Sequence, residues 1–400
     1  MTALTADQIA RVKATAPVLA ELGTTITTHF YKRLFANHPE LKHLFNQAHQ
    51  QSGGQPQALA RAVYAYAANI DNLGALGGAV AHITQKHASL NIRAEHYPIV
   101  GENLLASISE VLGDAIDQPT LDAWAAAYGQ LAGILIGAEQ TLYDGAAWSG
   151  FRPFVVMRKE MESEEITSFY LKPSDGGKVC DFAPGQYISV KRFVKEIGVD
   201  QPRQYSLSDA PNGQWLRISV KRERPADLPA GHISNGLHDG VEVGSIVEVG
   251  APMGEFSLDR SKTTPVVLMS GGVGITPMVA MLASLVGEGS ARRVVFAHAC
   301  RHGGVHAFRH WLNEVVATHP NVSRAVFYET ARAADLQGTD FDFRGRMDWA
   351  QFVGSALLPD ADYYVCGPVG FMSAQVAALH AAGIPSTRIH TEIFGSGTLG

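Results

Sequence analysis

One histidine in the first third of the sequence lies among apolar residues at helical spacing. Val80, Ile83, His87 and Leu90 are separated by three, four and three positions, which places them on one face of a predicted helix. An isolated buried histidine is more often a core residue satisfied by a backbone carbonyl than a ligand. A neutral imidazole in an apolar pocket between helices is also what a haem iron needs as its axial ligand. The spacing alone therefore leaves both interpretations open.

Three further polar side chains are predicted to point inward from other helices. Glu139 shares a helix face with three leucines, Tyr31 shares one with two apolar residues, and Tyr97 follows His87 by ten residues. A buried carboxylate is costly unless it has a partner. A carboxylate that accepts a hydrogen bond from a ligand histidine fixes its tautomer and raises its basicity. We therefore predict that these four side chains form one interior polar site.

Three regions with different patterns of apolar residues must position the candidate residues. Residues 1–145 have apolar positions three and four apart and are predicted to be helical. Residues 154–260 form short alternating strands separated by turns, as in an antiparallel barrel or sandwich. Residues 265–400 alternate apolar strands with helices, as in a parallel α/β sheet. We expect domains over 1–147, 152–260 and 265–400.

The composition excludes several classes of protein. A formal net charge of −6 argues against a nucleic-acid partner. The three cysteines, Cys180, Cys300 and Cys366, form no CxxC pair, which excludes a disulfide scaffold and a local zinc site and fits a reducing cytoplasm. The N-terminus lacks the apolar run of a signal peptide. Pro265–Gly287 is uncharged, but glycines and a proline interrupt it, so we predict a strand, a loop and a helix rather than a membrane span.

The middle region contains a candidate flavin site. In "RQYSLSD", Arg203 offers a forked donor for a phosphate, Tyr205 a flat face for an isoalloxazine ring, and Ser206 a hydroxyl for a ring nitrogen. An ordinary half-exposed strand explains the same pattern about equally well. In "GHISNGLH", Gly231 and Ser234 fit a helix N-terminus that holds a pyrophosphate.

The last region contains a candidate nucleotide site. "SGGVGITPM" follows a predicted strand, and Gly271, Gly272 and Gly274 would let the backbone approach a pyrophosphate. Thr276 is predicted to be the N-cap of the next helix, with Pro277 at its first position.

Two other sequence features bear on the nucleotide. "CGPVGFM" follows another strand, and Cys366 is either close to the nicotinamide or a small buried residue. Arg301 and His302 follow the second strand, where a 2′-phosphate would lie. An arginine there permits a phosphate contact without requiring one, so the choice between NADH and NADPH stays open.

Three stretches, "HFYKRLFANHPELKHLFN", "QALARAVYAYAANI" and "QKHASLNIRAEHYPIVGENLL", resemble the globin domain of the flavohaemoglobins, and the likeness covers the whole chain in the same domain order. The resemblance implies haem b bound by His87, a proximal relay of Tyr97 and Glu139, and a distal tyrosine, Tyr31, that hydrogen-bonds bound oxygen. It assigns the remaining distal positions to Gln55 and Leu59. It also assigns redox tuning to Lys86 and Glu392, which would face each other between domains.

The rest of the chain resembles the ferredoxin–NADP reductase-like modules of that family. The resemblance implies a multidomain protein with an all-α globin domain, an antiparallel β-barrel FAD domain and an α/β parallel-sheet nicotinamide domain. The implied FAD residues are Gln186, Tyr187, Arg203, Gln204, Tyr205, Ser206, Gly231 and Ser234, with Phe394 of "TEIFGSG" covering the flavin. The implied NADH or NADPH residues are Gly271, Gly272, Val273, Gly274, Ile275, Thr276, Cys366, Gly367 and Pro368.

Pro56 affects the predicted backbone conformation of Gln55, one of the residues assigned to the distal side. Gln55 precedes Pro56, and a residue before proline is disfavoured in the α region. Two alternatives are open: the helix begins at Pro56 and leaves Gln55 in a loop, or the helix includes both residues.

The resemblance implies nitric oxide dioxygenase activity, in which NO and O2 become nitrate with electrons relayed from NAD(P)H through FAD. One alternative is a haem-dependent reductase of alkyl hydroperoxides or NO. Another is an oxygen or lipid carrier whose reductase only keeps the iron ferrous, with lipid in the distal pocket. We expect a cytoplasmic monomer without a nucleic-acid partner or a membrane span.

Overall fold

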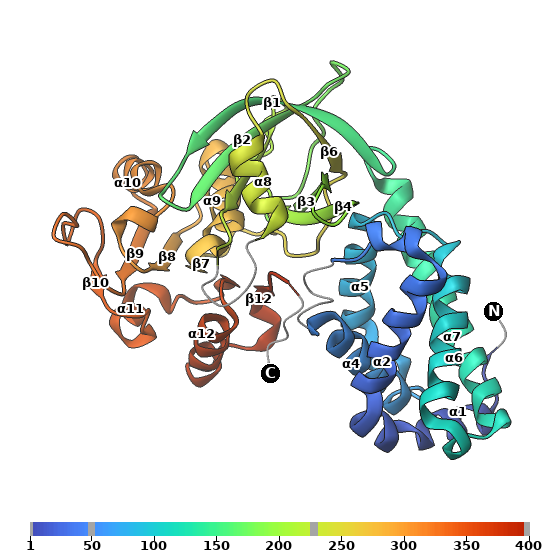
Figure 1. Ribbon diagram of the computed structural model, residues 1–400. Helices are drawn as coiled ribbons and strands as arrows, with labels where there is room; N and C mark the ends of the chain where they lie inside the picture. The colour runs from blue at the N-terminus through green and yellow to red at the C-terminus, as the bar shows by residue number, and fades with distance from the viewer. Residues whose placement is uncertain (1–2, 47–52, 225–230, 396–400) are drawn as a thin grey trace. The chain divides into compact units, whose positions relative to one another are not determined.

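The computed structural model describes residues 3–46, 53–224 and 231–395 (Figure 1). The chain divides into two compact units, each of which is described by itself. The first unit comprises Met1–Arg152, Ser189–Arg203 and Gly250–Glu255, and the second comprises Pro153–Ile188, Gln204–Val249 and Phe256–Gly400.

The N-terminal part of the chain is helical, as predicted, and is coloured blue to green in Figure 1. Its helices are α1 (Ala6–Ala14), α2 (Ala16–Asn37), η1 (Pro39–His43), α4 (Gly54–Ala68), η2 (Leu73–Leu76), α5 (Gly77–Ser89), α6 (His96–Leu112), η3 (Gly113–Ala115) and α7 (Gln118–Gly145). Side chains that satisfy backbone amides mark where helices begin. Thr5 and Gln8 form a capping box at α1, and the Asp117 carboxylate accepts from the Thr120 amide at α7.

Small residues let these helices approach closely. A Cβ at Gly23 of α2 would lie 3.4 Å from the Cβ of Ala60 in α4, so the two helices pack almost backbone to backbone. At the crossing of α6 and α7, a Cβ at Gly101 would lie only 2.4 Å from the ring of Tyr128. The apolar faces of α1, α2, α6 and α7 share one core, in which Phe30 is almost completely buried.

The middle of the chain forms a six-stranded sheet with the strand order β4-β3-β6-β1-β2-β5. Its elements are β1 (Phe151–Met161), β2 (Ile166–Pro173), β3 (Tyr187–Val194), β4 (Val199–Ser206), β5 (Leu216–Lys221), α8 (His232–Gly240) and β6 (Ile246–Gly250). β2 pairs antiparallel with both β1 and β5. An isolated antiparallel bridge between Leu207 and Ile218 joins the end of β4 to β5, so the sheet curls back on itself as a barrel does.

The C-terminal part forms a parallel sheet with the strand order β10-β9-β8-β7-β11-β12. Its elements are β7 (Val266–Gly271), η4 (Gly272–Gly274), α9 (Ile275–Gly287), β8 (Val294–Cys300), η5 (Gly303–Val305), α10 (Arg309–Thr318), β9 (Val322–Tyr328), β10 (Phe343–Arg344), α11 (Trp349–Ala356), β11 (Asp362–Cys366), α12 (Val369–Ala381), η6 (Ser386–Arg388) and β12 (Ile389–Glu392). The apolar segment 265–287 is therefore a strand, a short turn and a helix, as predicted. Within the described residues, no helix is long and apolar enough to cross a membrane.

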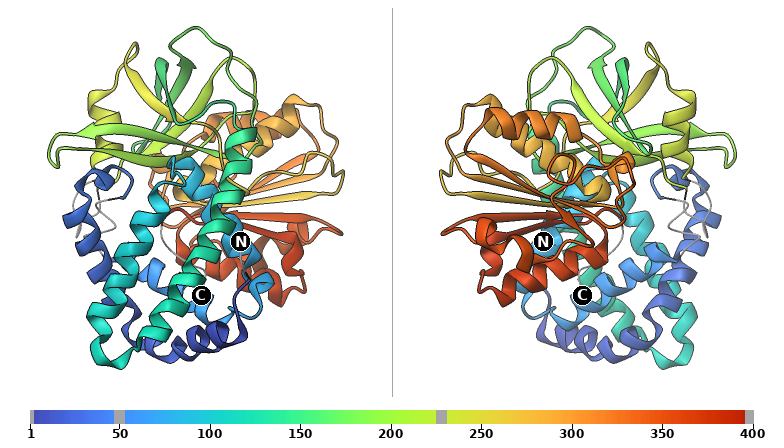
Figure 2. Two further views of the ribbon diagram at one scale, coloured as in Figure 1. Left: turned by 90° about the vertical axis from the view of Figure 1, so that its right-hand side faces the viewer. Right: turned by 90° about the vertical axis from the view of Figure 1, so that its left-hand side faces the viewer.

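Helices cover both faces of the parallel sheet (Figure 2). Val266 and Leu268 of β7 pack in one buried cluster with α9 and α10, whereas Val267 and Met269 pack in another with α11 and α12. This alternation explains why the strands are apolar without interruption, because both faces are buried. The fold class predicted from the sequence is confirmed for all three regions.

Candidate functional site

Three of the four predicted interior polar groups form one hydrogen-bonded network. Nδ1 of His87 on α5 lies 2.8 Å from Oε1 of Glu139 on α7 and 3.1 Å from the hydroxyl of Tyr97 in the first turn of α6. The Tyr97 hydroxyl donates to the same Glu139 oxygen at 2.5 Å. Burial, together with this carboxylate, raises the pKa of Tyr97 far above its ordinary value, so the phenol stays protonated.

The network fixes the orientation of the imidazole. Glu139 is only 2% exposed, so its carboxylate depends on these donors, whereas 33% of the His87 side chain is exposed. When Nδ1 donates to Glu139, the lone pair of the imidazole resides on Nε2. Across the described ranges, Nε2 of His87 makes no hydrogen bond. A neutral imidazole with one nitrogen held by a carboxylate and the other unengaged fits the proximal ligand of a haem.

Two tyrosines that the sequence analysis missed hold the backbone around this network. The Tyr128 hydroxyl donates to the carbonyl of Tyr97 at 2.6 Å, and the Tyr143 hydroxyl donates to the carbonyl of Ile92 at 2.5 Å. The Ile92 amide in turn donates to the carbonyl of His87 at 3.0 Å. Both tyrosines lie at helical spacing from Glu139 on α7, and that spacing was a signal by which they could have been found.

The fourth predicted group, Tyr31, lies in a different cluster. It is 7% exposed on α2, and its ring packs against Phe30, Phe35 and Phe45 with centroids 4.8–5.9 Å apart. Leu59 of α4 packs against the same cluster. Tyr31 is therefore not part of the hydrogen-bonded network of His87, so the prediction of one site for all four side chains is wrong for Tyr31, and its assignment to the distal side of a haem stays a prediction.

The structure answers the question raised by Pro56. Helix α4 begins at Gly54, so both Gln55 and Pro56 lie in its first turn and the loop alternative for Gln55 is wrong. A proline is tolerated there because first-turn amides have no intrahelical acceptor. The hydroxyl of Thr27 on α2 donates to the Pro56 carbonyl at 2.8 Å and so attaches the start of α4 to α2.

Lys86 and Glu392 belong to different units, so their predicted pairing stays a prediction. Lys86 precedes His87 on α5, and Glu392 ends β12 in register with Cys366 of β11. Cys366 is fully buried, and burial raises the pKa of its thiol well above its ordinary value. The thiol is therefore protonated, which suits a small packing residue rather than a nucleophile.

The predicted flavin residues lie on three elements of the middle region. Arg203, Gln204, Tyr205 and Ser206 end β4, Gln186 directly precedes β3, Tyr187 begins β3, and Gly231 is the N-cap of α8. The Ser234 hydroxyl donates to the Gly231 carbonyl at 3.2 Å and accepts from the Glu223 amide at 3.2 Å. The lead-in at 225–230 and the tail from Ser396 lie outside the described residues, and Phe394 is 42% exposed.

The two nucleotide motifs meet at the carboxyl edge of the parallel sheet. A Cβ at Gly274 would lie 2.2 Å from the carbonyl oxygen of Cys366, and a Cβ at Gly367 would lie 3.0 Å from the amide of Gly271. Only glycine permits so close an approach. Gly272 has a φ of +54° and open space around its Cβ position. A glycine turn between a strand and a helix, at the carboxyl ends of parallel strands, fits a dinucleotide pyrophosphate.

The predicted N-cap of the helix after this turn is wrong. Helix α9 begins at Ile275 with Gly274 as its N-cap, so Thr276 and Pro277 lie inside the first turn. The glycines form the 3₁₀ turn η4, which lets the helix start earlier than Thr276. The Thr276 hydroxyl donates to the Val273 carbonyl at 3.0 Å instead of capping the helix.

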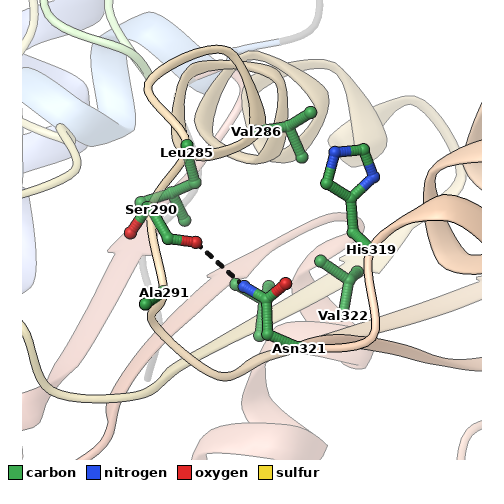
Figure 3. A pocket seen from close by; sticks show the side chains of 9 residues that line it. Leu285, Val286, Ser290, Ala291, His319, Asn321 and Val322 are labelled. Carbon is green, nitrogen blue, oxygen red and sulfur yellow. Dashed lines mark hydrogen bonds between the residues drawn. The ribbon is translucent and has the colours of Figure 1, made fainter.

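A hollow of about 320 Å³ lies elsewhere on the parallel-sheet region (Figure 3). Leu285, Ser290, His319 and Asn321 are among its lining residues, and the Asn321 amide donates to the Ser290 carbonyl at 3.0 Å. These residues precede β8 and β9, so the hollow is at the amino edge of the sheet. Nucleotides bind at the carboxyl edge of such sheets, and the hollow is therefore not the coenzyme site.

Three protein families match successive parts of the chain. The globin family matches residues 28–135, the oxidoreductase FAD-binding domain family matches 153–258, and the oxidoreductase NAD-binding domain family matches 268–377. Together with the geometry of the sites, these matches define a haem- and flavin-containing oxidoreductase that uses a nicotinamide coenzyme.

Comparison with individual proteins gives the family. The chain is 55% identical to a flavohaemoprotein of Chromobacterium violaceum over 391 residues, covering 96% of each chain, and 55% identical to one of Bordetella pertussis over 395 residues, covering 97% of this chain and 98% of the other. A crystal structure of flavohaemoglobin from Malassezia yamatoensis with bound FAD and haem is similar over 98% of this chain and 100% of that chain, with a TM-score of 0.86 and 28% identity. The FAD/NAD-binding domain of a nitric oxide dioxygenase from Vibrio cholerae matches 61% of this chain and 98% of its own, at 40% identity and a TM-score of 0.55. The chain belongs to the flavohaemoproteins.

Proposed function

We propose that this flavohaemoprotein is an NAD(P)H-dependent nitric oxide dioxygenase, which converts NO and O2 to nitrate. The name of the Vibrio cholerae protein supports this activity, since a nitric oxide dioxygenase shares the reductase half of the chain. When bound, haem supplies the iron at which O2 and NO react, and FAD divides the electron pair of a hydride into single electrons. We further propose domain boundaries at 1–147, 152–260 and 265–400.

The single observation that carries the proposal is the buried contact between His87 and Glu139. A carboxylate 2.8 Å from Nδ1 draws the N–H proton toward itself and so increases the electron density on Nε2. In our proposal His87 holds the iron, while Glu139 and Tyr97 keep the imidazole strongly donating. Such a ligand suits a site that activates O2, whereas a reversible carrier has no use for it.

The distal residues would orient the substrates. We propose that the hydroxyl of Tyr31 donates a hydrogen bond to O2, with Gln55 as a second polar contact and Leu59 as an apolar wall. The aromatic rings around Tyr31 exclude water, which strengthens a hydrogen bond formed there. The glycine turns of the parallel sheet would hold the pyrophosphate of the coenzyme, and the residues ending β4 would hold FAD.

The proposal can be tested with the whole protein loaded with both cofactors. With NADH and air, we expect NO to be consumed, NADH to be oxidised and nitrate to accumulate. His87→Ala should abolish NO consumption but leave the reduction of the flavin by NADH intact, because the residue lies in the helical part alone. Nitrous oxide as the product would favour an NO reductase, and slow NO consumption with stable O2 binding would favour a carrier.

A further inference from the structure

Two arginines lie at the edge of the parallel sheet where the adenosine ribose of a nicotinamide coenzyme binds. β8 is the second strand of this sheet and pairs in parallel with β7, which leads into the glycine turn. In such folds the residues just after the second strand contact the 2′ position of the ribose, where NADPH carries a phosphate and NADH a hydroxyl. Arg301 is the first residue after β8, and His302 follows it. A guanidinium nitrogen of Arg332 lies 3.0 Å from Nε2 of His302.

Both guanidinium groups are engaged by carboxylates from the turn between β1 and β2. Arg301 donates to Glu165, and Arg332 donates to both oxygens of Glu164, the second at 3.0 Å. The two-point contact with Glu164 matches the fork of a guanidinium to a carboxylate, which is the geometry a phosphate would also use.

A main-chain hydrogen bond also holds Glu164 beside the loop after β8. The Glu164 amide donates to the carbonyl of Gly304 at 2.9 Å, so the turn is attached to the loop after β8 by main chain as well as side chain. A Cβ at Gly304 would lie 2.2 Å from the Glu164 carboxylate, so the carboxylate would have to move if this residue carried a side chain. The hydrogen bond from Arg332 lowers the pKa of Glu164, which is therefore charged at neutral pH.

The surrounding charges are unfavourable for a phosphate. Asp335 accepts from the amides of Gly303 and Arg332 at 3.2 and 2.7 Å and adds a third carboxylate to the two from the turn. Arg309, whose guanidinium faces Gly303, is itself paired with Asp340 at 3.4 Å. Each nearby arginine thus has its own carboxylate and one carboxylate remains in excess, so a dianionic phosphate would have to displace a glutamate and approach other negative charges.

We propose that Glu164 and Glu165 are specificity-determining residues, which select NADH over NADPH by occupying Arg332 and Arg301. A 2′-hydroxyl needs neither arginine, whereas a 2′-phosphate must compete for both. The inference rests on the nicotinamide-dependent reduction in the proposed function, but it does not depend on which oxidant the haem uses.

The test measures reduction of the flavin in the full-length holoprotein, anaerobically, with NADH or NADPH as the only reductant. We expect the wild-type protein to use NADH with a higher kcat/KM than NADPH. The double variant Glu164→Gln, Glu165→Gln should raise kcat/KM for NADPH roughly tenfold, the size expected when two exposed ion pairs no longer compete, and leave the value for NADH within about twofold. Adding Arg301→Ala and Arg332→Ala together to the double variant should remove most of the gain, because the two released guanidinium groups are what bind the phosphate.

A matched control removes an ion pair at the amino edge of the parallel sheet, away from the proposed coenzyme site. Glu288 pairs with Arg260 at 2.5 Å beyond the end of α9, with exposures similar to those of the Glu164 pair. Glu288→Gln should not change the ratio of the two coenzymes. An unchanged ratio in the double variant, a gain that survives the loss of both arginines, or equal use of both coenzymes by the wild type would each overturn the inference. Failure of NO turnover alone would count only against the proposed dioxygenase activity.

Discussion

Replacement of Glu139 by glutamine removes the charge of the network that joins His87, Tyr97 and Glu139, and preserves its shape. The carboxylate of Glu139 accepts from both His87 and Tyr97 through Oε1, at 2.8 and 2.5 Å. Each hydrogen bond to a charged group contributes about 1.5–3 kcal/mol, and glutamine keeps one neutral acceptor. Removing a buried charge offsets part of this loss. We therefore expect the free energy of unfolding to change by less than about 2 kcal/mol.

The effect of Glu139→Gln on function should be larger than its effect on stability. An amide draws the Nδ1 proton of His87 less strongly, so Nε2 becomes a weaker donor. Loss of a residue that supports a metal ligand typically costs roughly 10–100-fold in activity, and we expect a loss of NO consumption in that range. The iron–histidine stretching frequency of the ferrous protein, measured by resonance Raman spectroscopy, should shift downward.

Two control variants separate the effect of the Glu139 carboxylate on His87 from other effects. Tyr97→Phe removes one donor to the carboxylate and keeps the contact between Glu139 and His87, so the downward shift should be smaller than with Glu139→Gln. Glu102→Gln changes an exposed glutamate of α6 outside the network and should leave the frequency unchanged. An unchanged frequency in Glu139→Gln protein that still binds haem would refute the reasoning.

Three further substitutions test other parts of the account. His87→Ala should give protein that keeps FAD but binds little haem, as measured by the Soret-to-flavin absorbance ratio, and full haem content would refute the assignment of the ligand. Gly101→Ala places a Cβ 2.4 Å from the ring of Tyr128 and should lower the free energy of unfolding by about 1–3 kcal/mol in urea; an unchanged midpoint would show that the ring moves aside. Gly274→Ala places a Cβ 2.2 Å from the carbonyl of Cys366 and should slow flavin reduction by NADH without changing the haem content; normal reduction rates would argue against the glycine turn as the coenzyme site.

The chain offers controls for the two glycine substitutions. Gly129 of α7 and Gly287 at the end of α9 have open space at the Cβ position. Alanine at Gly129 should raise the free energy of unfolding by about 0.5–1 kcal/mol, because alanine restricts the unfolded chain more than glycine does. Alanine at Gly287 should leave the rate of flavin reduction unchanged.

Helical periodicity predicted that His87 and Glu139 point inward, whereas their grouping with Tyr97 was implied by the resemblance to the flavohaemoglobins. His87 and Glu139 each interrupt an apolar stripe, and a polar residue in such a stripe needs a partner. The contacts of Tyr128 and Tyr143 were missed because their phenols bond backbone carbonyls, and a pattern of side chains does not show where a carbonyl lies. The start of α4 was left open because the local preference of a residue before Pro56 competes with a hydrogen bond from Thr27, far away in the sequence.

The ion pair of Arg301 at the carboxyl edge of the parallel sheet could not be predicted from the sequence either. Arg301 was predicted to lie where a 2′-phosphate binds, and it does follow β8. Its partner Glu165 lies 136 positions earlier, in a turn between two strands of the other sheet. Periodicity and motif spacing describe neighbours along the chain, so they could not indicate that this arginine is already engaged. The helix start at Ile275 was missed for a local reason, because the conformational freedom of the glycines allows a 3₁₀ turn.

The most direct test of the central claim is the origin of the oxygen atoms in the product. The holoprotein would be supplied with NADH, NO and isotopically labelled dioxygen, and the nitrate formed would be analysed by mass spectrometry. Dioxygenase activity predicts nitrate that carries both labelled oxygen atoms, with NADH consumed in proportion. Nitrate without the label, or nitrous oxide as the main product, would contradict the proposed function.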